Sequence, residues 1–142
     1  FRRVLFRSKN RLLIEALDKR FRVLDFGSKL DNYLDSADLA FTTASTTSFE
    51  IIARKIPLGI VCSVKNQKSN YESLTLKGLA APIGEFLNTN WCWNYEQIYK
   101  ILNVPVFREQ IQSSMLNFLD YKGCERIIHF INEFMGKLNN SH

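Results

Sequence analysis

The stretch ADLAFTTASTTSFEIIARKIPLGIVCSVKNQKSNYESLTLKGLAAPIG, residues 37–84, decides the fold. Its first apolar run, residues 37–42, predicts a buried strand, and residues 58–63 predict a second and clearer one. Between them a polar turn leads into a predicted helix over 45–55, which ends before Pro57. A strand, a helix and a second strand in this order predict a right-handed βαβ unit in a parallel sheet.

Outside this block the alternation of strands and helices continues in both directions. Four apolar residues of the last predicted helix stand at the spacing of core positions: Ile127, Ile128, Ile131 and Phe134. We therefore predict the α/β class, with a Rossmann-like parallel sheet and a helical C-terminal tail. The further expected elements are a helix at 9–20, a strand at 21–26, helices at 30–34 and 71–76, a short edge strand at 80–83, and helices at 95–102, 107–119 and 124–135.

The composition is that of an ordinary folded domain. Of the 142 residues, 46% are hydrophobic and 23% are charged, which excludes disorder as the dominant state. No apolar run approaches the ~20 residues of a membrane-spanning helix, and the first residues lack the pattern of a signal peptide. Cys62, Cys92 and Cys124 fit neither a disulfide framework nor a metal site, so we expect reduced thiols in a cytoplasmic protein, without a bound metal or cofactor.

The net charge of +5 comes largely from the first eight residues. Arg2, Arg3 and Arg7 lie in this segment, and the 19 basic residues of the chain less these three leave 16 against 14 acidic residues. Such a balance gives no basic field, so we expect no nucleic-acid partner. Residues 2–8 also match the in-frame translation of a common sequencing adapter, and we interpret residues 1–8 as a library scar, the alternative being a natural basic amphipathic start.

The turn after the first strand of the block has the features of an anion site. Backbone N–H groups of Ser45, Thr46 and Thr47 lie at the start of the helix, where they and the helix dipole can hold a phosphate or diphosphate. Glu50 follows one turn later, and its carboxylate could accept hydrogen bonds from both hydroxyl groups of a ribose. Plain capping of the helix is the alternative explanation of Ser45 and Thr46.

The turn after the second strand offers two adjacent side-chain amides, Asn66 and Gln67. Amides donate to and accept from sugar hydroxyl groups without carrying charge, although such a turn is also typical of solvated surface. In an open parallel sheet both turns lie at the carboxyl ends of their strands, the edge where ligands bind. Together the two turns provide the groups that a nucleotide sugar requires.

The block resembles the nucleotide-binding half of GT-B enzymes of the MurG-like class. Within that class it is most similar to the UDP-2,4-diacetamido-2,4,6-trideoxy-beta-L-altropyranose hydrolases of pseudaminic acid synthesis and to their relatives in spore-coat polysaccharide synthesis. The resemblance is carried by residues within 37–84. The matching positions are Ala37-Asp38-Leu39, the turn 43–47, Glu50, Pro57, Asn66-Gln67 and Asn70.

This resemblance implies a function and a role for each matching residue. The chain would be the nucleotide-sugar-binding C-terminal half of a GT-B fold, in a hydrolase that cleaves a UDP-linked sugar during nonulosonic acid or surface-polysaccharide synthesis. Asn70 would fix the second loop, and Ala44 stands where the family usually has Gly, which puts the phosphate geometry in question. The implied contacts are Thr43, Ser45, Thr46 and Thr47 to the diphosphate, Glu50 to the ribose, and Asn66 and Gln67 to the sugar.

The resemblance also implies that the chain is truncated at its N-terminal side. Residues 9–142 would be a partial domain that lacks two strands from the middle of its sheet, and an N-terminal Rossmann domain of the same protein would precede them. The water-activating residue of the hydrolases belongs to that domain, so we expect no catalytic residue and no turnover in this chain alone. We expect residues 3–6 to pair as a substitute strand.

Three alternatives stay open, and one of them is that the fragment neither folds nor functions. A glycosyltransferase that uses the same UDP-sugar donor would share every feature above and would differ in the missing domain. A non-catalytic flavodoxin-like binding domain would instead require an acidic cluster at the strand ends, for which Asp35 and Asp38 are the candidates.

Other conspicuous residues have structural explanations. We expect His129 to be half-buried within the helical tail. Trp91, Trp93 and Tyr95 alternate in an extended segment, and we expect their rings to pack against the helical tail rather than to stack on a nucleobase.

Overall fold

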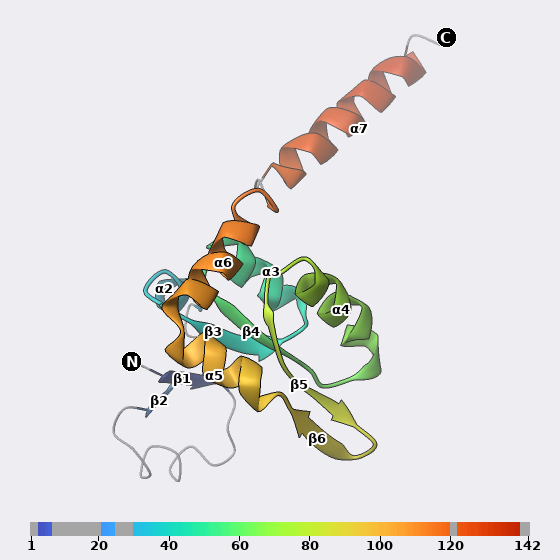
Figure 1. Ribbon diagram of the computed structural model, residues 1–142. Helices are drawn as coiled ribbons and strands as arrows, with labels where there is room; N and C mark the ends of the chain where they lie inside the picture. Colours follow the sequence, from blue (N-terminus) through green and yellow to red (C-terminus); the bar gives the residue numbers. More distant parts are fainter. Residues whose placement is uncertain (1–2, 7–20, 25–29, 120–121, 140–142) are drawn as a thin grey trace. The chain divides into compact units, whose positions relative to one another are not determined.

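A computed structural model describes residues 3–6, 21–24, 30–119 and 122–139 of the chain (Figure 1). The chain divides into two compact units, Phe1–Ser36 and Ala37–His142. The helix that we predict at 9–20 lies outside the described residues.

The first unit contains a small parallel sheet of two strands, β1 (Arg3–Phe6) and β2 (Phe21–Leu24). Their register places Arg3 opposite Phe21 and Phe6 opposite Leu24. A short helix, α2 (Leu30–Leu34), follows. The expectation that residues 3–6 pair as a strand is therefore confirmed, and so are the predicted strand after residue 20 and the short helix at 30–34.

The second unit is built on a sheet of four strands in the order β3-β4-β5-β6. Strands β3, β4 and β5 run parallel, and β6 joins antiparallel to β5 through a tight hairpin (Figure 1). Their bounds are β3 (Ala40–Thr43), β4 (Leu58–Cys62), β5 (Ala81–Leu87) and β6 (Asn90–Trp93). The α/β class is confirmed, and the sheet is consistent with a Rossmann-like fold.

Helices connect the parallel strands and cover the sheet. In Figure 1, α3 and α4 lie on one side of the sheet and α5 lies on the other. The helices are α3 (Thr46–Ala53), the 3₁₀ turn η1 (Lys65–Gln67), α4 (Lys68–Leu76), α5 (Tyr95–Asn103), α6 (Pro105–Met115) and α7 (Gly123–Asn139). Within the described ranges, each helix is either too short or too polar to span a bilayer.

The core lies where the helices meet β4. Leu58 and Ile60 of this strand are fully buried, because helices cover both faces of the sheet there. The helices contribute further fully or nearly fully buried side chains, namely Ile51, Ile52, Leu74, Ile101, Ile111 and Met115. The continuous apolar run of β4 follows from this double coverage and explains why it is the clearest strand in the sequence.

Helices α3 and α4 end in the same backbone conformation with different residues. Lys55 follows α3 with φ 58°, and Gly78 follows α4 with φ 67°. Glycine adopts this left-handed conformation without strain, whereas a residue with a Cβ does not. At Lys55 the backbone oxygen accepts a hydrogen bond of 3.0 Å from Gln112 Nε2, which fixes the end of α3 to α6.

The predicted edge strand at 80–83 is wrong in both length and position. Strand β5 continues to Leu87 and lies inside the sheet, because Asn88 and Thr89, with φ values of 47° and 73°, form a tight turn that leads into β6. Asn88-Thr89 lacks the glycine that usually marks such a hairpin turn in a sequence.

The aromatic residues of the hairpin contact one another. The rings of Trp91 and Trp93 stack with centroids 4.9 Å apart, and Phe86 lies 5.4 Å from Trp91. Trp93 also lies directly over Gly84, where a Cβ would come within 2.8 Å of the indole ring. Trp91 and Trp93 therefore pack on their own hairpin, whereas Tyr95 begins α5 and is 75% exposed. A contact of the two indole rings with the helical tail stays a prediction.

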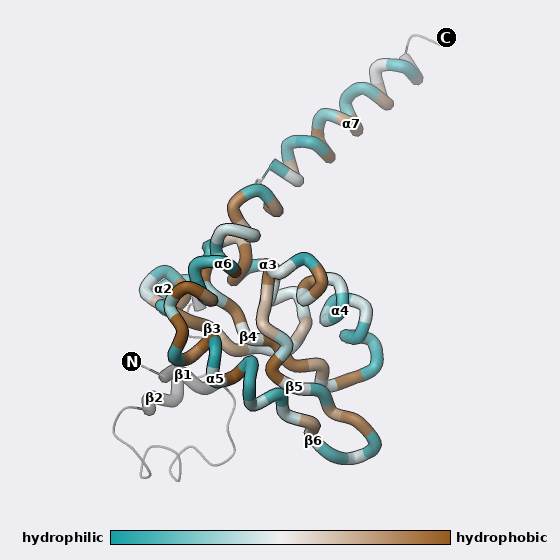
Figure 2. Tube along the Cα trace, viewed as in Figure 1, coloured by the Kyte–Doolittle hydropathy of each residue, from teal (hydrophilic) through white to brown (hydrophobic). Residues whose placement is uncertain are grey.

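The apolar residues of α7 are the second departure from the sequence-based expectation. Ile127, Ile128, Ile131 and Phe134 are each more than half exposed, and His129 is 77% exposed, so neither the predicted core nor the half-buried histidine is found. Helical spacing shows which face of a helix is apolar, and it does not show what that face packs against. Hydrophobic and hydrophilic positions alternate along this helix in Figure 2.

Candidate functional site

The two turns singled out in the sequence follow neighbouring parallel strands. Thr43 ends β3 and pairs with Val61 near the end of β4, so the backbone leaves both strands at the same edge of the sheet. The first turn leads into α3 and the second leads through η1 into α4. This edge is where ligands bind in open parallel sheets.

The start of α3 is not capped by a side chain. Ser45 is the N-cap residue, as predicted, but it makes no side-chain cap hydrogen bond, and its Oγ instead donates weakly to Thr43 O at 3.5 Å. Ser48 N donates to Ser45 O at 3.0 Å. The N–H groups of Thr46 and Thr47 have no acceptor in the part of the chain that the structure describes. Side-chain capping, the alternative explanation of Ser45, is therefore not observed.

The buried hydroxyl group of Ser48 holds the same turn by a hydrogen bond to its backbone. The Ser48 side chain is fully buried, and its Oγ donates to Ser45 O at 2.5 Å. Ala44 is also fully buried, and its N–H donates to Val61 O at 2.9 Å. The φ of Ala44 is not in the left-handed region, so its methyl group causes no backbone strain. The turn is thus fixed to β4 with alanine, not glycine, at position 44.

Glu50 lies on the outer face of α3. Ser48, Ile51 and Ile52 form the buried face of this helix, whereas Thr46 and Glu50 are exposed and stand four residues apart on the opposite side. Residues at this spacing are neighbours on a helix surface. The unpaired amide at the helix start and the carboxylate one turn later therefore share one exposed face.

Side chains fill the second turn themselves. Gln67 Oε1 accepts hydrogen bonds from Ser63 N at 3.1 Å and from Ser63 Oγ at 3.0 Å. These two bonds occupy the amide oxygen, so the Nε2 group is what Gln67 can offer to a ligand. Asn66 is exposed in η1, and Asn70 is exposed within α4 rather than in a loop. The loop is held by Gln67, and the loop-fixing role of Asn70 stays a prediction.

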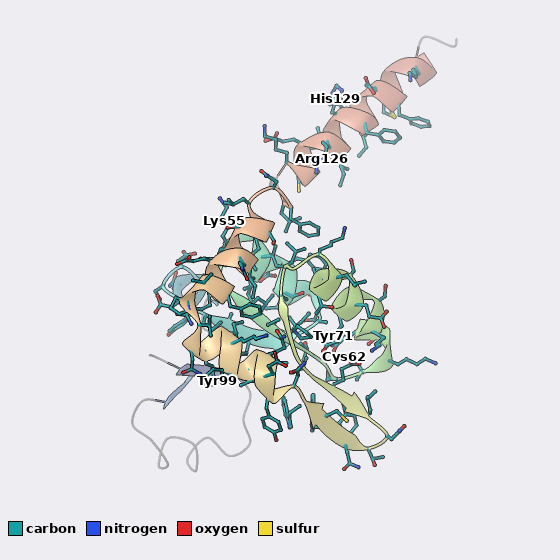
Figure 3. The ribbon with its side chains drawn as sticks, viewed as in Figure 1. Lys55, Cys62, Tyr71, Tyr99, Arg126 and His129 are labelled. Atoms are coloured by element: carbon teal, nitrogen blue, oxygen red, sulfur yellow. The ribbon has the colours of Figure 1, made fainter. Side chains whose placement is uncertain are left out.

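A charged cluster lies beside the second turn. Lys68 Nζ is 2.5 Å from Glu85 Oε2 of β5 and 3.5 Å from Glu72 Oε1 of α4. The same ammonium lies 5.6 Å from the ring centroid of Tyr71. Figure 3 shows Cys62 and Tyr71 side by side, and both groups feel the charges of Glu85 and Lys68.

Burial and charge change the protonation equilibria in this cluster. The hydrogen bond with Glu85 raises the pKa of Lys68, so the ammonium is charged at neutral pH. Burial raises the pKa of Tyr71 to about 12, and burial also raises the pKa of the Cys62 thiol. The phenol and the thiol are therefore neutral and unreactive in the folded protein.

Part of this arrangement has no signal in the sequence. Ser63 follows β4 and has no unusual neighbours in the sequence, yet it fixes the orientation of Gln67. Lys68 and Glu85 are separated by 17 positions, so only the pairing of β4 with β5 brings them together. Among the described residues no group of three or more His, Cys, Asp or Glu side chains could hold a metal ion.

Comparison with known proteins adds nothing to this geometry. No protein-family model matches the chain, and no curated protein or solved structure matches it either. The resemblance to GT-B enzymes stays a prediction that depends on the residues quoted above.

Proposed function

We propose that this chain is the nucleotide-sugar-binding C-terminal half of a GT-B-fold enzyme, a hydrolase that acts on a UDP-linked sugar in nonulosonic acid or surface-polysaccharide synthesis. The observation that carries the proposal is the pair of unpaired N–H groups at the start of α3, next to a second polar turn on the same edge of the sheet. In this proposal each turn binds a different part of the ligand.

The first turn binds the diphosphate. The N–H groups of Thr46 and Thr47 have no acceptor among the described residues, and an anion at a helix start is favoured by such donors and by the helix dipole. Hydroxyl groups of Thr43, Ser45 and Thr47 lie in or beside the turn as additional donors. The hydrogen bonds of Ser48 to Ser45 O and of Ala44 N–H to Val61 O fix the turn. The donors therefore do not have to be ordered when the ligand binds.

Glu50 binds the ribose. Its carboxylate is exposed, and it lies one helical turn from Thr46 on the same face of α3. A carboxylate in this place accepts hydrogen bonds from two vicinal hydroxyl groups, and one turn of helix keeps it away from the diphosphate charge.

Gln67 binds the sugar from the second turn. Ser63 holds its amide oxygen, and its Nε2 group donates to an oxygen of the ligand. Asn66, exposed beside it, supplies a second amide. Water activation is the task of the N-terminal domain, so the chain alone binds the donor without turnover.

Titration calorimetry of the full chain with UDP tests this proposal. Replacing Glu50 by Ala should weaken UDP binding by about 1–3 kcal/mol, because a charged hydrogen bond to the ribose is lost. The matched control is Glu109→Ala, an exposed carboxylate on α6, which should leave the affinity unchanged. Replacing Gln67 should weaken binding of a UDP-sugar more than binding of UDP.

Two results would contradict the proposal. A folded chain that does not bind UDP would exclude the nucleotide site, and equal affinities of the Glu50→Ala variant and the parent would exclude the ribose contact. Circular dichroism of each variant confirms that the fold is retained, so that a loss of binding is assigned to the site.

A further inference from the structure

Strand β6 ends the sheet of the second unit, and its outer edge is open. The strand order is β3-β4-β5-β6, so β6 pairs with β5 on one side and with no other described strand on the other (Figure 1). All residues of Asn90–Trp93 are exposed. The two strands that the resemblance implies are missing belong to the middle of the sheet, so they would not cover this edge.

The register of the hairpin shows which backbone groups face the open edge. Asn94 N donates to Ile83 O at 3.0 Å, one position beyond the last residue pair of β5 and β6. In an antiparallel ladder, hydrogen-bonded pairs alternate with pairs that exchange no bonds. Cys92 is therefore bonded to β5, whereas the N–H and C=O groups of Trp91 and Trp93 point to the open edge.

This edge lacks several features that keep exposed strands from pairing. Natural proteins protect sheet edges with charged side chains, proline or bulges. Strand β6 contains neither a charged residue nor proline, and its register with β5 is regular. Its short length limits a new pairing to a few hydrogen bonds, so the edge is suited to a partner strand that binds weakly.

A second copy of β6 matches the open edge in one antiparallel register. With Trp91 opposite Trp93 of the second copy, the open residues of both strands are all paired, and four N–H···O bonds form. A shift by two residues leaves one open residue of each strand without a partner. A shift by one residue places open groups opposite groups that are already bonded to β5. In the matching register, Cys92 lies on the two-fold axis.

The side chains of β6 permit this pairing with itself. A two-fold axis brings residues near it close to their own copies, so a charged residue there would repel its counterpart. Cys92 and its neighbours Trp91 and Trp93 are uncharged. The two indole rings stack 4.9 Å apart on one face of the hairpin, and the pairing places the indoles of the second copy beside them.

The exposed area of the hairpin fits a weak dimer. Phe86, Trp91 and Trp93 are between 41% and 44% exposed, and an aromatic side chain carries roughly 150–250 Å². The three rings therefore present on the order of 250 Å² per copy, well below what stable specific complexes bury. We expect a dissociation constant in the micromolar range or weaker. Because both copies use the same edge, the association stops at the dimer.

We propose that two copies of this chain pair through the outer edges of their β6 strands, antiparallel and with Cys92 on the two-fold axis. The two four-stranded sheets then form one continuous sheet. This association is independent of the nucleotide-sugar function proposed above.

Sedimentation equilibrium of the full chain, at concentrations up to the millimolar range, tests the association with a matched pair of variants. Trp91→Pro removes an N–H group at the open edge and keeps the bonds to β5, whereas Trp91→Ala removes the same ring and keeps that N–H. The parent should dimerise, and Trp91→Pro should dimerise at least about tenfold more weakly than Trp91→Ala, because two of the four bonds are lost. Far-ultraviolet circular dichroism confirms that both variants fold.

Three sedimentation results would overturn the proposal. A parent that is monomeric at every concentration excludes the dimer, and assemblies larger than the dimer exclude an association that closes on a two-fold axis. Equal dimer constants for Trp91→Pro and Trp91→Ala exclude pairing through the backbone of β6.

The exposed thiol of Cys92 tests the register. Opposed residues of a pair without hydrogen bonds have Cα atoms about 4.5 Å apart, which is within the range of a disulfide. Mild oxidation of the dimer with diamide should therefore link the two copies through Cys92. Cys92→Ser should abolish the link, and Cys124→Ser should not. A link through Cys124 instead, or a Trp91→Pro variant that links as fast as the parent, overturns the pairing.

Discussion

The βα units that follow β3 and β4 share one architecture and differ in how each turn uses its polar groups. In the β3–α3 connection, the amides of Thr46 and Thr47 have no acceptor among the described residues and no side chain caps α3. In the β4–α4 connection, Ser63 donates two hydrogen bonds to the side-chain oxygen of Gln67, and Lys68 forms an ion pair with Glu85. The first turn therefore leaves two backbone donors open, whereas the second is organised by hydrogen bonds and an ion pair of its own side chains.

The prediction with the greatest change concerns Tyr71 in α4, which makes the stability of the protein depend on pH. Because the pKa of Tyr71 is raised from 10 to about 12, its contribution is fully present below pH 10 and is lost as the pH rises from 10 to about 12. The parent should lose about 2–3 kcal/mol of unfolding free energy over this interval through Tyr71. Urea denaturation at a series of pH values measures the loss.

Tyr71→Phe is the control for this pH dependence. The variant keeps the ring and removes the titrating group, so its stability should fall less steeply above pH 10. The decline that remains belongs to other groups, among them Lys68, whose raised pKa also gives stability that is lost at alkaline pH. Parallel declines in parent and variant would mean that the phenol of Tyr71 is not buried.

Removing the amide of the second turn should produce the next largest effect. Gln67→Ala leaves the half-buried Ser63 N–H and hydroxyl groups without their acceptor and should cost about 1–2 kcal/mol of stability. Asn66→Ala, at the exposed neighbouring position, should cost less than about 0.5 kcal/mol. Equal urea midpoints for the two variants would show that Gln67 does not hold the turn.

Helices α3 and α4 also differ in the residue that ends each of them in the left-handed conformation, Lys55 and Gly78. Gly78→Ala places a Cβ on a residue with φ 67° and 3.3 Å from Ser114 Oγ, so the variant should be destabilised by about 1–2 kcal/mol. Thermal denaturation measures this change. Gly136→Ala is the matched control, because a Cβ at that position meets no atom within 4 Å and it should not destabilise the protein.

The smallest expected effect has the opposite sign. Lys55 follows α3 in the left-handed conformation in which Gly78 follows α4, and Lys55→Gly relieves this strain. The variant should gain about 0.5–1 kcal/mol, since the added freedom of the unfolded chain offsets part of the relief. A lower melting temperature for Lys55→Gly would show that the lysine side chain stabilises this end of α3.

Local patterns account for the parts of the fold that the sequence predicts correctly. The apolar run of β4 is continuous because helices cover both faces of the sheet there, and Ser45 marks the start of α3 as an N-cap residue even without a side-chain bond. Asn66 and Gln67 are expected after β4 and are found there.

Contacts between distant segments account for the errors. The length of β5 depends on its pairing with β6 across a turn that contains no glycine, and the partner of the apolar face of α7 is not encoded in the spacing of that helix. The candidate site shows the same limit. The sequence predicts both polar turns, but it does not predict the ion pair of Lys68 in α4 with Glu85 in β5, which lie 17 positions apart.

The stack of Trp91 on Trp93 has a practical consequence. The chain has two tryptophans, and both lie in β6, so tryptophan fluorescence, excited selectively at wavelengths where tyrosine does not absorb, reports on the hairpin alone. Two indoles held 4.9 Å apart also couple excitonically, which gives a circular dichroism band that disappears when β6 loses the strand conformation that aligns them. Loss of this band ahead of the far-ultraviolet signal would reveal an edge of the sheet that opens before the parallel strands separate.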